Sequence, residues 1–132
     1  MRILIVDDDY ISRTQIKVLL LGYGDCDIAP NGEIALTLFD AAHEENMPYD
    51  LISVDVDMPG MSGQELVNEI RQREDALGAA ARSTEAKIIM VSSMDDGKNI
   101  MSSFRQGAEG YLVKPVNPAK LKETLDEIRI MG

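Results

Sequence analysis

Four short apolar runs, rich in β-branched side chains, limit the fold of this chain more than any other feature. They span residues 3–6, 51–54, 88–91 and 111–113, and each is bounded by polar residues or glycine. Within each run the apolar residues are nearly continuous, whereas a strand with one solvent-exposed face alternates apolar and polar residues. Continuous runs are typical of strands buried on both faces, so they predict a parallel sheet. A weaker strand around residues 26–29 carries the acid Asp27, which favours a position nearer the sheet edge.

Stretches with apolar residues at helical spacing separate these runs. Ser62 precedes one stretch and Glu65 follows three residues later, as in a capping box. Asn117 precedes another, with Pro118 at the first helical position. Helices are predicted from Ile11 to a close at Gly22, after Asn31-Gly32, from Ser62 onward, from about Asp95 to Gln106, and after Asn117-Pro118.

Five strands alternating with five helices predict the α/β class, with a doubly wound five-stranded parallel sheet and helices on both faces. A chain of 132 residues is long enough for one domain and too short for two comfortable ones, so we expect a single domain over residues 1–132. Ligands of such sheets bind outside the carboxyl ends of the strands. Function is therefore expected from the residues that directly follow each apolar run.

The composition excludes several classes of protein. The net charge of −10 repels phosphate backbones, so direct binding of nucleic acid is not expected. Cys26 is the single cysteine, so no intramolecular disulfide can form and a reducing, cytoplasmic setting is expected. The chain shows no signal-peptide pattern and no apolar run near the ~20 residues that span a bilayer, so no membrane segment is expected.

Carboxylates, a hydroxyl and an ammonium follow the apolar runs. Clustered carboxylates raise one another's pKa unless a cation compensates, and an all-oxygen site of this charge favours Mg²⁺. The alternative is that the acids cap the helices that follow, as Asp9 is placed to do. Capping does not explain a serine and a lysine at the same edge, so we favour a site. Its candidate residues are Asp7, Asp8 and Asp9 after the first run, Asp55 and Asp57 after the second, Ser92 after the third and Lys114 after the fourth.

Three segments carry a resemblance to a known family: ILIVDDD at residues 3–9, residues 50–63 ending in MPGMSG, and YLVKP at residues 111–115. In order and spacing they resemble the receiver domains of bacterial two-component response regulators, and the likeness covers essentially the whole chain. Each segment alone is a weak signal, whereas the three together are highly specific. The resemblance implies the flavodoxin-like receiver fold and a switch that accepts a phosphoryl group.

The resemblance also assigns roles around a metal ion. Asp55 matches the phosphoacceptor. Asp8 matches the direct ligand of Mg²⁺, and Asp7 matches the acid that acts through water. Asp55 and the backbone carbonyl of Asp57 are implied as further ligands of the metal.

Three more residues match the family's phosphoryl-binding and switch positions. Ser92 matches the hydroxyl that moves to bond the phosphoryl group, and Lys114 matches the lysine that neutralises its charge. Tyr111 matches the aromatic residue that swings inward, although without the resemblance an ordinary half-buried strand aromatic is an equally good interpretation. The Lys114-Pro115 bond resembles the family's cis peptide, since an X–Pro bond adopts cis at a cost of only about 0.5–1 kcal/mol.

Partners follow from the same resemblance. The implied phosphodonor is a phosphohistidine on a sensor histidine kinase or a phosphotransfer protein, while the downstream target or output domain is not indicated. The chain is expected to take part in its own Mg²⁺-dependent phosphorylation and dephosphorylation rather than to act as an enzyme. After phosphorylation we expect tighter association, either with a second copy as a homodimer or with a partner, through the fourth helix, last strand and fifth helix. Ile100 and Phe104 on this face could equally face the core. Residues 71–87 exceed the family's usual link and predict an extended third helix followed by a loop.

Three alternatives remain at this stage. Asp55-Val56-Asp57 fits the Asp-x-Asp motif of haloacid-dehalogenase phosphohydrolases, but their motif follows the first strand, and this chain has no cap-sized insertion. A nucleotide-binding fold would need a Gly-rich phosphate loop after the first strand, where this chain has three acids. A receiver-like module that binds without being phosphorylated is the third alternative, and the complete set of matched residues argues against it.

Overall fold

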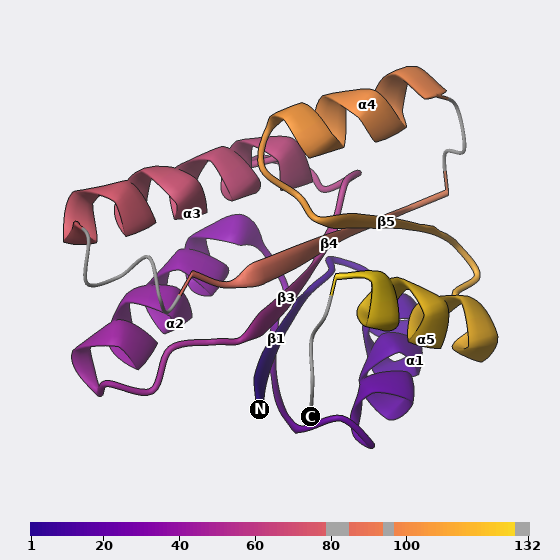
Figure 1. The fold of residues 1–132 in the computed structure, drawn as a ribbon, viewed down its shortest axis with the longest axis horizontal. Helices are drawn as coiled ribbons and strands as arrows, with labels where there is room; N and C mark the ends of the chain where they lie inside the picture. Colours follow the sequence, from indigo (N-terminus) through magenta and orange to yellow (C-terminus); the bar gives the residue numbers. More distant parts are fainter. Residues whose placement is uncertain (79–84, 94–96, 129–132) are drawn as a thin grey trace.

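Strands and helices alternate along the chain in a computed structural model that describes residues 1–78, 85–93 and 97–128 (Figure 1). The α/β class and the alternation predicted from the apolar runs are confirmed. In chain order the elements are β1 (Arg2–Val6), α1 (Tyr10–Leu20), β2 (Asp25–Ala29), α2 (Gly32–Glu44), β3 (Leu51–Asp55), α3 (Gly63–Leu77), β4 (Lys87–Ser92), α4 (Gly97–Arg105), β5 (Gly110–Val113) and α5 (Pro118–Glu127).

The strands form one parallel sheet in the order β2-β1-β3-β4-β5. The strand β2 therefore lies at an edge, as its acid Asp27 predicted. In the register, Ser53 of β3 lies between Ile5 of β1 and Ile89 of β4, so the central strands end at nearly the same level. The residues that follow β1, β3 and β4 are consequently neighbours in space, at the carboxyl edge of the sheet.

Helices cover both faces of the sheet, which explains why the apolar runs do not alternate. Leu4 and Val6 of β1 point to one face, where they pack in a core cluster with residues of α2 and α3. Ile3 and Ile5 point to the other face and pack with residues of α1 and α5. Figure 1 shows the two pairs of helices on opposite sides of the sheet. Truncating a side chain as buried as Leu4 to alanine is expected to cost about 2–5 kcal/mol.

Local caps begin the helices at the positions that the sequence indicated. Asp9 accepts a hydrogen bond from the backbone N–H of Ser12, which confirms it as the N-cap of α1. Ser62 and Glu65 form the capping box of α3. Asn117 caps α5, with Pro118 in its first turn.

The predicted extension of the third helix is confirmed, because α3 continues to Leu77. The loop that was predicted after it falls largely on residues 79–84, outside the described residues. The fourth helix, predicted from about residue 95 to 106, spans Gly97–Arg105, and residues 94–96 are likewise outside the described residues.

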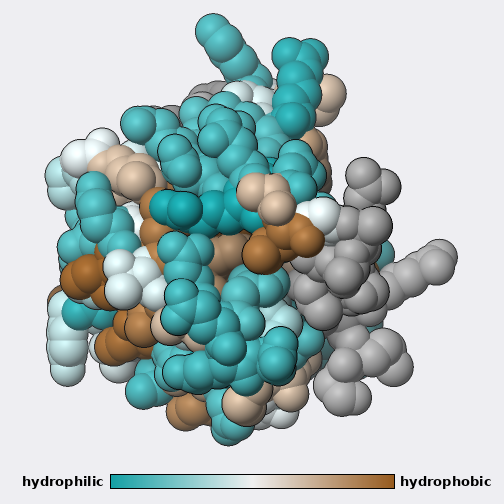
Figure 2. Space-filling view, turned by 90° about the vertical axis from the view of Figure 1, so that its left-hand side faces the viewer, coloured by the Kyte–Doolittle hydropathy of each residue, from teal (hydrophilic) through white to brown (hydrophobic). Residues whose placement is uncertain are grey.

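The surface opposite the carboxyl edge is mainly hydrophilic. It carries the beginning of β4 and the C-terminal part of α3, and its apolar side chains gather only in small groups (Figure 2). For the described part of the chain, the helices are all too short or too polar to cross a bilayer.

Candidate functional site at the carboxyl edge of the sheet

Three carboxylates meet where β1 and β3 end. Asp7 and Asp8 directly follow β1, and Asp55 is the last residue of β3. One oxygen from each of the three carboxylates lies within 4.8 Å of the other two. Asp7 is fully buried and Asp55 is 4% exposed, whereas Asp8 faces solvent. The acidic cluster predicted from the sequence is thus assembled, and one side of it is open.

Lys114 brings an ammonium group to these carboxylates from the end of β5. Its Nζ lies 3.2 Å from Oδ2 of Asp7 and 3.6 Å from Oδ1 of Asp55. Its backbone N–H donates to the carbonyl of Ser92 at 2.8 Å. This bond holds the start of the loop between β5 and α5 against the end of β4. The peptide bond that follows, Lys114-Pro115, is cis as the resemblance implied.

The charges at this edge do not balance. Among the described residues, the ion pairs of Asp7 and Asp55 are both made with the same Lys114. Burial and the neighbouring Asp7 carboxylate raise the pKa of Asp55 to about 7, although Lys114 and the Asp57 N–H act to lower it. Burial also opposes the charge of Lys114, but the Asp55 and Asp7 carboxylates outweigh it and raise the pKa of this ammonium.

Asp57 connects Asp55 to Ser92 through two hydrogen bonds. Its backbone N–H donates to Oδ1 of Asp55 at 3.2 Å. Its carboxylate Oδ2 accepts a hydrogen bond from the Ser92 hydroxyl, also at 3.2 Å. Ser92 itself is fully buried at the end of β4. The sequence placed both residues at the edge but did not indicate that the Asp57 carboxylate holds the Ser92 hydroxyl.

Tight backbone packing positions the loop that follows Asp55. A Cβ at Gly63 would lie 2.2 Å from the carbonyl oxygen of Asp55, so only glycine lets the start of α3 approach the end of β3 this closely. Gly60 adopts a φ of 74°, in the left-handed region that favours glycine. The MPGMSG segment therefore holds the start of α3 close against the backbone of Asp55.

Two contacts of Asp7 were not foreseen. The Arg13 side chain donates from Nη1 to the backbone carbonyl of Asp7 at 3.0 Å. The backbone N–H of Asp9 donates to Oδ1 of Asp7 at 2.9 Å. The second contact follows the Asx-turn pattern, which could have been inferred from the run of three acids. The first depends on how α1 packs and has no local signal.

Tyr111 lies on β5, which β4 separates from β3 and its carboxylate Asp55. It pairs in register with Met90 of β4 and packs, half-buried, against the core cluster that contains residues of α2 and α3. Of the other candidate switch-face residues, Phe104 is 43% exposed and Ile100 is half-buried.

The oxygen atoms of this edge suit a hard divalent cation. Asp7 Oδ2 is buried and accepts no hydrogen bond of good geometry among the described residues, so Lys114 satisfies it only as an ion pair. Carboxylate oxygens with an open, solvent-facing side are the environment in which Mg²⁺ keeps some of its waters. Asp8 and Asp55 could hold such an ion directly, with Asp7 behind them.

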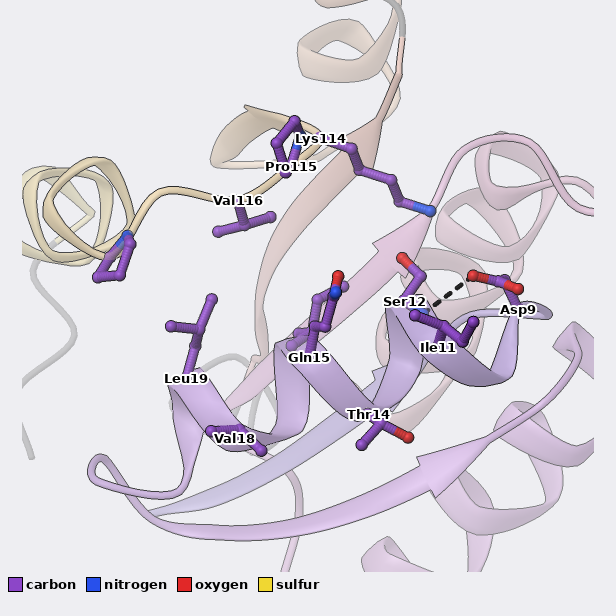
Figure 3. A pocket seen from close by; sticks show the side chains of 12 residues that line it. Asp9, Ile11, Ser12, Thr14, Gln15, Val18, Leu19, Lys114, Pro115 and Val116 are labelled. Carbon is purple, nitrogen blue, oxygen red and sulfur yellow. Dashed lines mark hydrogen bonds between the residues drawn. The ribbon is translucent and has the colours of Figure 1, made fainter.

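An apolar groove of about 700 Å³ begins beside the carboxylates and runs along α1 (Figure 3). Gln15 and Leu19 of α1 point toward Val116 of the loop before α5, and Lys114 reaches toward the first turn of α1. Asp9 and Lys114 line the groove, so it is continuous with the site.

Comparison with known proteins identifies the family to which this chain belongs. The family model described as the response regulator receiver domain matches residues 3–126. The chain belongs to this family. Receiver domains are signalling switches of two-component systems, and membership in the family displaces the phosphohydrolase and nucleotide-binding alternatives.

Relatives of this receiver domain include single-domain and longer proteins. The chemotaxis protein CheY-3 of Vibrio cholerae is 33% identical over 130 residues, which cover 97% of this chain and 91% of that protein. The nitrate/nitrite response regulator NarL of Escherichia coli is 30% identical over 95% of this chain, which spans only 53% of NarL.

A solved structure of another receiver domain has the same fold. The receiver domain of the histidine kinase CKI1 from Arabidopsis thaliana matches with a TM-score of 0.82 and 30% identity, over 97% of this chain and 89% of that one. That domain was crystallised in complex with Mg²⁺ and BeF₃⁻.

Proposed function

We propose that this receiver domain accepts a phosphoryl group on Asp55 from a phosphohistidine and changes conformation in response. The observation that carries the proposal is the meeting of three carboxylates and the Lys114 ammonium at the open edge of the sheet. In the step itself, an oxygen of the Asp55 carboxylate forms a bond to phosphorus while the bond from phosphorus to the imidazole nitrogen breaks. The electron pair returns to the imidazole, whose other nitrogen carries a proton, so a neutral ring leaves.

The residues around Asp55 fit the charges of this step. Lys114 stands 3.6 Å from the Asp55 carboxylate and would neutralise phosphoryl oxygens from one side. Asp8, Asp55 and the backbone carbonyl of Asp57 would hold Mg²⁺ directly, and Asp7 would hold it through water. When bound, the metal supplies positive charge to the phosphoryl oxygens from the other side.

The conformational response is proposed to run from Ser92 to Tyr111. Phosphoryl oxygens on Asp55 would offer a new acceptor to the Ser92 hydroxyl at the end of β4. Drawing Ser92 toward them would displace the segment that leads into α4 and allow the half-buried Tyr111 to move inward. A local charge change that biases an element with two arrangements is the general basis of phosphorylation switches.

The groove along α1 is proposed as the surface that receives the phosphodonor. It is continuous with the site through Asp9 and Lys114, and exposed apolar residues of α1 flank it, with Ile11 and Val18 each 65% exposed. An apolar stripe beside a charged centre suits a helix of the phosphohistidine-bearing domain of a sensor kinase or a phosphotransfer protein. The exposed Met101 and Phe104 of α4 form a separate patch, through which phosphorylation would favour self-association or an output partner.

The test begins with a small phosphodonor. Incubation with acetyl phosphate and Mg²⁺ should place one acyl phosphate on Asp55, identified by trapping and peptide mapping. The Asp55→Asn variant should remain unmodified, whereas Asp57→Asn should still be modified. Robust acyl phosphate on the Asp55→Asn variant would refute the assignment of the phosphoacceptor.

The surface for the phosphodonor is tested separately. Ile11→Glu should lower the rate of phosphorylation by autophosphorylated sensor kinases relative to the rate with acetyl phosphate, which needs no docking surface. A comparable substitution on the far side of the molecule, Met47→Glu, is the matched control, because Met47 is 57% exposed. An equal effect of the two substitutions on this ratio would rule out the groove as the docking surface.

A further inference from the structure

A hydrogen bond joins Ser92 and Asp57, which have different roles in the proposed switch. Asp57 would hold Mg²⁺ through its backbone carbonyl, and the Ser92 hydroxyl would bond to the phosphoryl group. The Ser92 hydroxyl is fully buried, and its proton is directed at the Asp57 carboxylate 3.2 Å away. The same Asp57 donates its backbone N–H to the Asp55 carboxylate. Asp57 thus contacts both the proposed phosphoacceptor Asp55 and the Ser92 hydroxyl that would bond to its phosphoryl group.

The backbone around this hydrogen bond is held in place from both strands. The N–H of Val56 donates to the carbonyl of Val91 at 3.0 Å, and the N–H of Lys114 donates to the carbonyl of Ser92 at 2.8 Å. The first bond fixes the end of β3 relative to β4, and the second fixes the end of β5 against Ser92. The approach of the Ser92 hydroxyl to the Asp57 carboxylate therefore follows from the packing of the strand ends.

A phosphoryl group on Asp55 would compete for the same proton. A serine hydroxyl has one proton to donate. A phosphorylated Asp55 would present anionic oxygens within reach of Ser92, at the moment when the Asp57 carboxylate already accepts that proton. Both acceptors are charged, and hydrogen bonds to charged acceptors are the stronger class. The two states of Ser92 are thus separated by an exchange of acceptors, and the Asp57 carboxylate stabilises the first.

We propose that the Asp57 carboxylate is a positioning residue that holds the Ser92 hydroxyl in the unphosphorylated arrangement and opposes its transfer to the phosphoryl group. This inference rests on the proposed function of Asp55. It adds that the side chain of Asp57, in addition to its backbone carbonyl, sets the balance between the two states. Removing the carboxylate should favour the switched arrangement.

A double-mutant cycle with the phosphoryl mimic beryllofluoride separates this role from simple charge repulsion. The affinity for beryllofluoride at saturating Mg²⁺ is measured for Asp57→Ala and Asp57→Asn, each with Ser92 intact and with Ser92→Ala. Asp57→Asn removes the charge but keeps an oxygen acceptor, so it is the matched control for Asp57→Ala. With Ser92 intact, Asp57→Ala should bind the mimic about tenfold more tightly than the wild type, the size expected for losing one hydrogen bond to a charged group.

With Ser92 intact, the affinities of Asp57→Ala and Asp57→Asn for beryllofluoride should differ. When Ser92→Ala is also present, the two affinities should become equal. A spectroscopic measurement supports the same conclusion independently. In the absence of the mimic, the amide resonance of Ser92 in Asp57→Ala should shift toward its position in the beryllofluoride-bound wild type. Ser92→Thr should keep the difference between Asp57→Ala and Asp57→Asn in affinity for the mimic, because threonine keeps the hydroxyl.

Three outcomes are informative. An equal gain from Asp57→Ala with Ser92 intact and with Ser92→Ala would mean that the carboxylate acts only through charge, and the proposal would be wrong. Weaker binding of the mimic by Asp57→Ala would also overturn it. Failure of the wild type itself to bind beryllofluoride would instead refute the proposed function of Asp55, and this inference with it.

Discussion

The two ends of the sheet both carry a partly buried ionic cluster in which carboxylates share one cation, but they differ in how the buried carboxylate oxygens are hydrogen-bonded. At the amino edge, Arg71 of α3 donates to the carboxylates of Glu74 and Glu109 and to the backbone carbonyls of Ala86 and Gly107. The remaining oxygen of Glu74 accepts the N–H of Ala86 at 2.8 Å. At the carboxyl edge Asp7 and Asp55 likewise share the Lys114 ammonium, but the buried Oδ2 of Asp7 accepts no hydrogen bond from the described residues.

This difference separates a structural cluster from a functional one. The guanidinium of Arg71 has enough donors for its neighbours and ties α3 to the beginnings of β4 and β5, so the amino edge needs no further ligand. The carboxyl edge leaves a raised pKa on Asp55 and a buried oxygen of Asp7 without a well-aligned donor. A buried carboxylate oxygen without a hydrogen-bond donor, next to a carboxyl group with a raised pKa, indicates where a cation or a covalent modification is expected.

The largest effect is expected from breaking the Arg71 cluster. Arg71→Met should lower the free energy of unfolding by about 3 kcal/mol, because Glu74 would remain buried without its cation. Urea unfolding measures the loss. Arg73→Met is the matched control, since Arg73 lies on the same helix and pairs with the exposed Asp40 at 3.8 Å, a contact worth less than about 1 kcal/mol. Equal losses in the two variants would contradict a structural role for the Arg71 cluster.

At the carboxyl edge, a substitution that removes a charge should instead raise the free energy of unfolding. The pKa of Asp55 is raised from 3.8 to about 7 in the folded state, so ionisation of this carboxyl destabilises the fold as pH rises through this range. In metal-free buffer, Asp55→Asn should therefore raise the free energy of unfolding by about 2 kcal/mol at pH 8. The gain should shrink toward pH 5, where the wild-type carboxyl is mostly protonated when folded. A gain that did not depend on pH would exclude ionisation of Asp55 as its cause.

A smaller effect distinguishes the acids of the DDD run. Asp8→Asn should weaken Mg²⁺ binding by about tenfold, because Asp8 offers a carboxylate oxygen to the cluster. Asp9→Asn should change it by less than about twofold, since the Asp9 carboxylate is directed at the N–H of Ser12. Titration of Mg²⁺ at pH 8 ranks the variants. Equal losses would mean that the residues are assigned one position out of register.

The smallest effect concerns the cap that borders the site. Asp9→Ala should lower the free energy of unfolding by about 1 kcal/mol, the usual value for an N-cap, whereas Asp9→Asn should keep most of the stability. Thermal unfolding at pH 7 compares the two variants. A similar loss in both would show that the charge of Asp9, rather than its cap, stabilises α1.

Most candidate site residues could be named from the sequence because each follows a recognisable strand. In a parallel sheet the carboxyl ends of the strands lie at one edge, so residues after β1, β3, β4 and β5 must approach one another. That argument predicted the meeting of Asp7, Asp8, Asp55 and Lys114, and the structure confirms it. Their proposed roles in phosphorylation rest on the family resemblance and await the experiments above.

The sequence could not indicate which side chains bond to one another across strands. Ser92 and Asp57 are 35 residues apart, and their hydrogen bond depends on the register of β3 with β4 and on the rotamer of each side chain. The contacts of Arg71 with Gly107 and Glu109 depend in the same way on how α3 crosses the ends of β4 and β5. These contacts between elements have no local sequence signal, whereas the Arg71–Glu74 pair lies within α3 at i,i+3 spacing.

The sequence by itself determined the strands, the helix starts and the identities of the groups at the carboxyl edge, because apolar continuity and capping act between residues close in the chain. Only the tertiary structure decided how the charged groups are hydrogen-bonded. It placed the Arg71 guanidinium, with its five donors, between Glu74 and Glu109 at one edge, and the Lys114 ammonium against Asp7 and Asp55 at the other. The physical reason is that the energy of a charge depends on its burial and on distances of a few ångströms to its partners, which the packing of distant segments sets.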